Sequence, residues 1–72
     1  MRKTFKLNDL DCANCAAKMQ EVISKIDGVT SANVNFMMQK LTIDADSERF
    51  DAIVDAAQAA ISKIEPDCTI VR

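Results

Sequence analysis

Apolar residues alternate with polar ones at the start of the chain and then recur at helical spacing. Phe5 and Leu7 share one face of the segment 3–10, which has the two-residue period of a half-buried strand. The polar segment 9–14 predicts a loop. A helix is predicted from Cys15, because the following apolar residues form one helical stripe: Ala16, Met19, Val22, Ile23 and Ile26.

The middle of the chain predicts a hairpin of two strands. Gly28 ends the first helix, because glycine readily takes the left-handed conformation of a helix cap. Alternation then returns over 29–36 and over 40–45. The connection between them is so short that the two strands must be antiparallel. Its turn carries Met37 and Met38, which we expect to lie far from the first polar loop and to pack locally or be exposed.

A second helix and a final strand complete the pattern. Asp46 or Ser47 can cap a helix whose apolar residues repeat at three and four positions over 50–64. Pro66 ends this helix, and the residue before a proline is driven toward extended geometry. The segment 68–71 then predicts a short strand.

The order strand, helix, strand, strand, helix, strand is typical of an α+β fold, the ferredoxin-like βαββαβ sandwich. We expect a four-stranded antiparallel sheet with two helices on one face, because each helix has one apolar stripe to bury. The chain of 72 residues is expected to form a single domain over 1–72, with no room for a catalytic domain. The other sheet face meets water through Thr4, Lys6, Asn33, Asn35, Thr42 and Asp44.

Charge and hydropathy exclude several classes of function. The formal net charge is −2, so no basic excess is present to neutralise the phosphates of a nucleic acid. No apolar run approaches the roughly 20 residues of a membrane span, and no hydrophobic stretch of a signal peptide follows the N-terminus. We therefore expect a cytoplasmic location and no direct membrane insertion.

Three cysteines and the absence of histidine define the candidate chemistry. An odd number of cysteines without a secretory signal argues against a disulfide framework. Cys12 and Cys15 form a Cys-X-X-Cys pair, which in a reducing compartment indicates a metal site or a redox dithiol. Without imidazole, a tight metal site must use thiolate, carboxylate, amide or thioether groups.

The segment 11–15 leads from a strand into a helix, which is a suitable place for a soft metal ion. The free N–H groups and the positive dipole end of the helix favour anions, so we expect a lowered thiol pKa, above all at Cys15. Asp11 can add a carboxylate to the thiolates of Cys12 and Cys15. This set suits a divalent ion better than a monovalent one, so it favours Zn(II), Cd(II) or Pb(II) over Cu(I). Three local ligands leave one position open for exchange, whereas a structural zinc site is closed by four.

A resemblance to a known family rests on the loop and on two later segments: Leu10-Asp11-Cys12-Ala13-Asn14-Cys15-Ala16, Gly28-Val29 and Val34-Asn35-Phe36. In the predicted order of elements, these residues resemble the heavy-metal-associated domain. The Asp-Cys-X-X-Cys form is similar to the cytosolic N-terminal metal-binding domains of zinc-, cadmium- and lead-transporting P-type ATPases. The resemblance implies reversible metal binding by Cys12 and Cys15, with Asp11 as third ligand. It also implies ligand exchange with other domains of a membrane metal transporter.

Three departures from the family pattern bear on the choice of metal. Asp9 stands where the family usually has glycine, and Leu10 stands where many members have methionine. Copper members place an aromatic residue or a lysine in the loop before the last strand, where this chain has Glu65-Pro66-Asp67. These differences weaken the copper interpretation.

Two other functions stay open at this point. One is a Cu(I) chaperone or copper-ATPase domain of the same fold, and the other is a small dithiol redox protein. No catalysis is expected from this chain alone, and as an ATPase domain it would be one part of the enzyme. Cys68 is expected in the core, although it can approach the metal loop, while Glu65 and Asp67 are expected to be solvated. We expect a monomer, with a metal-bridged dimer as the alternative.

Overall fold

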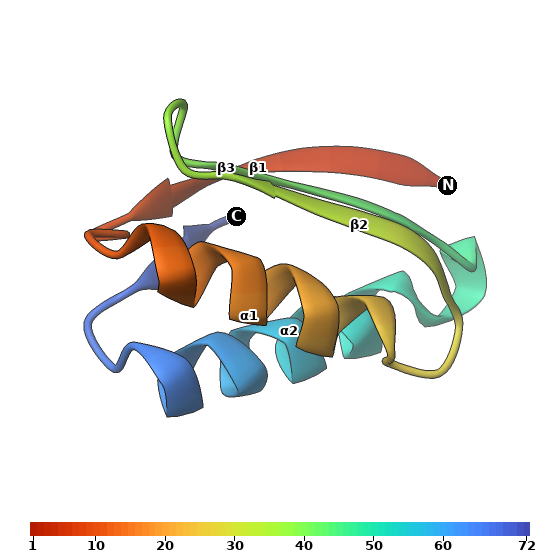
Figure 1. Cartoon of the computed structure of the whole chain (residues 1–72). Helices are drawn as coiled ribbons and strands as arrows, with labels where there is room; N and C mark the ends of the chain where they lie inside the picture. Colours follow the sequence, from red (N-terminus) through yellow and green to blue (C-terminus); the bar gives the residue numbers. More distant parts are fainter.

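The computed structural model describes residues 1–72 and has the predicted order of elements. Its four strands form one antiparallel sheet in the order β2-β3-β1-β4, and both helices cover one face of that sheet (Figure 1). The ferredoxin-like sandwich is therefore confirmed. The elements are β1 (Arg2–Asn8), α1 (Ala13–Ser24), β2 (Val29–Asn35), β3 (Lys40–Ala45), the 3₁₀ helix η1 (Ser47–Arg49), α2 (Phe50–Ile64) and β4 (Thr69–Val71).

The register of β1 on β3 explains why one sheet face is apolar and the other polar. Phe5 lies opposite Leu41 on the face toward the helices, where Leu41 is fully buried. One position away, Thr4 lies opposite Thr42, and their hydroxyl oxygens are 3.1 Å apart on the outer face. Because side chains alternate along a strand, this register sends the two sets to opposite faces.

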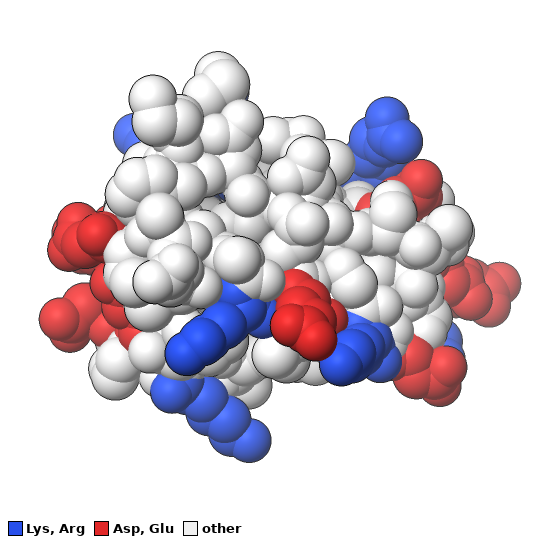
Figure 2. Space-filling model, viewed as in Figure 1, with Lys and Arg blue, Asp and Glu red and all other residues white.

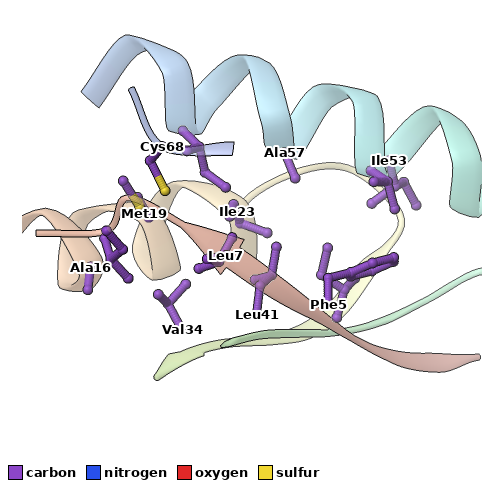
Figure 3. Packing of buried hydrophobic residues seen from close by; sticks show 14 of the residues in the cluster. Phe5, Leu7, Ala16, Met19, Ile23, Val34, Leu41, Ile53, Ala57 and Cys68 are labelled. Atoms are coloured by element: carbon purple, nitrogen blue, oxygen red, sulfur yellow. The ribbon is translucent and has the colours of Figure 1, made fainter. Parts of the chain in front are cut away.

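Sixteen buried residues form one hydrophobic core between the sheet and the helices, and no charged side chain is among them. Figure 3 shows Met19 and Ile23 of α1 and Ala57 of α2 facing Leu41 across this core. Val22 was predicted on the buried stripe but is 43% exposed. Neighbouring residues of a helix point about 100° apart, and here Ile23 faces the core while Val22 lies at the edge of the buried stripe. Neither helix is long and apolar enough to cross a bilayer.

The ends of α1 differ from the prediction by a few residues. The helix begins at Ala13, with Cys12 as its N-cap, and ends at Ser24. Gly28 has a φ of 94° and therefore takes a left-handed conformation, but it lies in the turn into β2 and not at the helix end. This turn brings the chain back to the sheet beside β3.

The ends of α2 follow the prediction closely. The Asp46 carboxylate accepts a hydrogen bond from the N–H of Glu48 at 3.1 Å and so begins η1, which continues into α2. At the other end, Glu65 is extended with φ −142° and ψ 97°, as expected for the residue before Pro66. The chain then turns into β4 on the free edge of β1.

Candidate metal site

The two cysteines of the Cys-X-X-Cys pair lie at the N-terminus of α1. Cys12 is the N-cap of the helix, with an extended backbone of φ −126° and ψ 117°. Its Sγ accepts a hydrogen bond from the backbone N–H of Cys15 at 3.2 Å. This bond is the usual contact from an N-cap side chain to the third helical residue, with sulfur in place of oxygen. Both thiols are free and half-buried, so a ligand can approach them.

The thiol pKa values differ in the direction opposite to the prediction. Hydrogen bonding from Cys15 lowers the pKa of Cys12, because the side chain and the N–H of Cys15 both stabilise the Cys12 thiolate. The same side-chain contact raises the pKa of Cys15, and desolvation and the charges of Cys12 and Glu65 add to this. Lys18 acts against them by lowering it. The expectation that Cys15 carries the lowered pKa is therefore wrong, since the N-cap position gives the acceptor role to Cys12.

The two carboxylates nearest the loop have different surroundings. Asp11 is exposed, and its backbone N–H donates to Oε1 of Glu65 at 3.4 Å. The other oxygen of Glu65, Oε2, is buried and has no hydrogen-bond partner. The negative charge of Glu65 raises the pKa of Cys12, Cys15 and Cys68. Glu65 was expected to be solvated, but the extended backbone after α2 turns its carboxylate toward the cysteine loop.

The structure brings the two predicted thiol ligands together and leaves the predicted carboxylate ligand apart from them. No group of three or more Cys, Asp or Glu side chains converges closely enough to hold a metal ion. The N–H of Cys15 is bound to the sulfur of Cys12, while Asp11 and Glu65 lie in two neighbouring loops that are joined by the hydrogen bond from the Asp11 N–H. The third donor that the sequence predicts is therefore not assembled with the two thiols.

Cys68 belongs to the core, as the sequence predicts. It is fully buried, and Figure 3 shows its side chain directed into the cluster toward Met19. Burial raises the pKa of the Cys68 thiol to about 11, because the ionised form loses its hydration there. Asp67, the residue before it, is exposed, as expected for a solvated side chain.

Sequence reasoning did not identify Gln39, in the turn between β2 and β3. The side-chain Oε1 of Gln39 accepts from the N–H of Leu10 at 3.1 Å, and its Nε2 donates to the Leu10 carbonyl at 2.6 Å. The turn therefore lies against the metal loop, and the expectation that it is distant is wrong. Met37 and Met38 are 88% and 58% exposed at its tip. Because β3 pairs with β1, the start of β3 lies beside the end of β1, which no local sequence signal reveals.

The end of the molecule that carries the cysteines is acidic. Asp9 and Asp11 lie in the loop before α1, and Glu65 and Asp67 lie in the loop after α2. Figure 2 shows acidic side chains at the left edge of the molecule, where Figure 1 places these two loops. Figure 2 shows acidic side chains at the opposite edge as well, so negative charge is not confined to the end that carries the cysteines.

A ferredoxin-like sandwich with two thiols at the start of its first helix defines a small module for thiophilic metal ions. The sequence profile of the heavy-metal-associated domain matches residues 4–67. The chain belongs to this family of heavy-metal-associated domains.

Curated relatives of the chain include metal-transporting ATPases of two kinds. A cadmium, zinc and cobalt-transporting ATPase of Bacillus subtilis is 29% identical over 70 residues, which are 97% of this chain and 10% of that one. A zinc/cadmium/lead-transporting P-type ATPase of Escherichia coli is 34% identical over 59 residues, or 82% of this chain and 8% of that one. A copper-exporting P-type ATPase of Bacillus subtilis is 30% identical over 60 residues, which are 83% of this chain and 7% of that one. The chain thus spans a tenth or less of the length of these relatives.

Solved structures with the same fold include a metallochaperone and an ATPase domain that was solved with Cu(I). The CopZ metallochaperone superposes with a TM-score of 0.72 at 23% identity, with 99% of this chain and 100% of that one covered. A second structure is the N-terminal domain of a potential copper-translocating P-type ATPase from Bacillus subtilis in its Cu(I)-loaded state. It superposes with a TM-score of 0.74 at 26% identity, with 96% of this chain and 84% of that one covered. The fold is thus common to chaperones and ATPase domains, and it does not select the metal.

Proposed function

We propose that this chain binds a divalent thiophilic ion, Zn(II), Cd(II) or Pb(II), and passes it on by ligand exchange. In this proposal it is a cytoplasmic N-terminal domain of a metal-exporting P-type ATPase. The observation that supports it is the pair of half-buried thiols at the N-terminus of α1 with two carboxylates in the flanking loops. The zinc- and cadmium-transporting relatives named above agree with this choice.

Binding begins at the thiol that ionises more easily. Cys12 has the lowered pKa, so its thiolate meets the incoming ion first. Cys15 follows, because coordination by a metal ion displaces the proton of a thiol even when its pKa is raised. Both sulfurs leave the ion accessible from solvent, since both side chains are only half-buried.

Charge balance supports a divalent ion. Two thiolates neutralise a divalent ion, and one carboxylate then leaves a single negative charge, whereas a monovalent ion would carry two. The proposal assigns the carboxylate to Asp11, which is exposed and directly precedes Cys12. Glu65 is the competing donor, because its buried Oε2 lacks any hydrogen-bond partner.

Ligand exchange follows from an incomplete coordination shell. Two sulfurs and one oxygen leave a fourth position free, where a ligand from another domain of the transporter can enter before the first ligands leave. A closed set of four protein ligands would hold the ion and not release it. We propose that the chain acts as a monomer and that it supplies binding, not catalysis, to the larger enzyme.

Titration of the reduced protein with Zn(II), Cd(II), Pb(II) and Cu(I), each against a competing chelator, tests the proposal. Amide shifts of Asp11, Cys12, Cys15 and Glu65 identify the responding residues. We expect Asp11→Asn to weaken Zn(II) binding about tenfold or more and to leave Cu(I) binding unchanged. If Glu65→Gln has this effect and Asp11→Asn does not, the third ligand is Glu65.

A copper function is the second candidate, because a copper-exporting ATPase is among the relatives and the ATPase domain quoted above was solved in its Cu(I)-loaded state. It predicts tight Cu(I) binding by Cys12 and Cys15 alone, weak divalent binding, and no effect of either carboxylate variant. That set of results would replace the divalent assignment. A dithiol that cycles at the cytosolic redox potential and binds no ion would instead support the redox alternative.

A further inference from the structure

Gln39 is bound to the end of β1 through its backbone and to the metal loop through its side chain. Its carbonyl accepts a hydrogen bond from the N–H of Leu7 at 2.7 Å, just beyond the last paired residues of β1 and β3. Its side-chain amide binds the N–H and the carbonyl of Leu10 at 3.1 and 2.6 Å, and Nε2 also donates to the carbonyl of Phe36 at 3.0 Å. The oxygen of this amide thus accepts one hydrogen bond, and its nitrogen donates two, to Leu10 and to Phe36.

The backbone on both sides of this contact is in a conformation that L-residues seldom adopt. Asp9 has a φ of 62° and Gln39 a φ of 56°, so each lies in the left-handed region without being glycine. Such conformations are strained and persist where the surroundings hold them. The amide of Gln39 supplies that restraint, because it fixes the residue directly after Asp9.

We propose that Gln39 is a positioning residue of the metal loop. Its amide holds the peptide groups of Leu10 and so fixes the segment that presents Cys12. Leu10 is itself only 2% exposed, so its side chain anchors the same point from the core. The next N–H, of Asp11, is bound to Glu65, and the Cys12 carbonyl accepts from the N–H of Ala16 at 3.0 Å.

The consequence for binding rests on the function proposed above. A loop that is already held in place does not have to be ordered when the ion binds, so the restraint raises the affinity for the ion. Groups that orient metal ligands without touching the metal are typically worth 10–100-fold in affinity. We therefore expect loss of the Gln39 amide to weaken Zn(II) and Cd(II) binding about tenfold, although Gln39 touches neither thiol.

Gln39→Gly removes the side-chain amide and keeps the backbone conformation of the turn. Glycine adopts a φ of 56° without strain, so the hairpin keeps its shape while the side-chain bonds to Leu10 are lost. The two readouts are hydrogen exchange at the Leu10 amide and the Kd for Zn(II) and for Cd(II). Faster exchange at Leu10, unchanged exchange in the hairpin at Leu41, and about tenfold weaker binding are expected.

Two further variants distinguish positioning from general damage to the turn. Asn35→Ala removes another side-chain bond of the same turn, from the Met38 N–H to Asn35 Oδ1 at 3.0 Å, without touching Leu10. It should leave metal affinity unchanged. Asp9→Gly in the Gln39→Gly background removes the left-handed strain before Leu10, and it should restore part of the lost affinity.

Each result has a definite meaning for the proposal. Unchanged Leu10 exchange and unchanged Kd in Gln39→Gly overturn it, as does equal weakening by Asn35→Ala. If the unaltered chain binds neither ion, the proposed divalent function fails. The exchange at Leu10 still decides in that case whether Gln39 fixes the loop.

Discussion

Cys12 has two roles that a single substitution can separate. Its Sγ caps α1 by accepting the N–H of Cys15, and the same sulfur is the proposed first ligand. Serine is among the preferred N-cap residues and cysteine is not. Cys12→Ser therefore keeps an acceptor at the cap and removes the thiolate, whereas Cys12→Ala removes both. Comparing the two variants tests whether the sulfur of Cys12 is needed for metal binding while the cap contact alone accounts for its effect on stability.

The size of the effect follows from the cap contact. An N-cap oxygen is worth about 1 kcal/mol relative to alanine. For a chain of 72 residues that free energy corresponds to a change in Tm of roughly 4–8 °C. We expect Cys12→Ser to melt at or slightly above the unaltered protein, because oxygen accepts at least as well as the sulfur at 3.2 Å. Cys12→Ala should melt roughly 4–8 °C below Cys12→Ser.

Thermal unfolding of the metal-free protein and chelator competition with Zn(II) provide the two readouts. Both variants should lose roughly 100-fold or more in Zn(II) affinity, since one of two thiolates is gone. A Cys12→Ser protein that melts well below the unaltered chain would refute the capping argument, since sulfur would then be needed for packing. A Cys12→Ser protein that keeps its Zn(II) affinity would remove Cys12 from the site.

Three further predictions concern the thiols and the glycine. Alkylation at increasing pH, read by mass spectrometry, should modify Cys12 before Cys15. The reason is that the pKa of Cys12 is lowered and the pKa of Cys15 is raised. Equal alkylation rates would contradict this prediction. The pKa of Cys68 rises from 9.0 to about 11 on burial, so its contribution to stability is complete below pH 9 and lost as the pH rises through 11. Urea unfolding should show a steeper loss over that interval in the unaltered protein than in Cys68→Ala. Gly28→Ala should cost about 1–2 kcal/mol in the same assay, because its φ is 94° and a new Cβ would lie 3.1 Å from Cδ1 of Ile53; an unchanged midpoint would be contrary evidence.

The fold was predictable because its signals are local and agree with one another. The alternation at Phe5 and Leu7, the helical stripe of α1 and the stop at Pro66 each select one element, and together they select one topology. The exact start of α1 was not predictable. Cysteine is a weak N-cap signal, so the pattern alone placed the helix start at Cys15 and not at Ala13.

The candidate site was predictable as a set of residue types but not as a set of contacts. The spacing of Cys12 and Cys15 identifies the thiol pair, and burial of Cys68 follows from its place beside a strand. The roles of Glu65 and Gln39 depend on segments that are distant in sequence. Glu65 is 54 residues from Asp11, and Gln39 is 29 residues from Leu10. Only the sheet order, which puts β1 between β3 and β4, brings both to the loop.

The placement of the third thiol fits a site that releases its ion. The negative charge of Glu65 acts on Cys68 as well as on the two loop cysteines, so all three thiols lie toward the same end of the molecule. A third thiolate would bring the shell closer to the closed sets of structural zinc sites, which retain their metal. Cys68 is completely buried, so its sulfur is held within the core and away from an ion at the loop. The same packing that stabilises the sandwich therefore restricts the proposed site to two sulfurs, and it leaves the rest of the shell to oxygen donors and to an incoming partner.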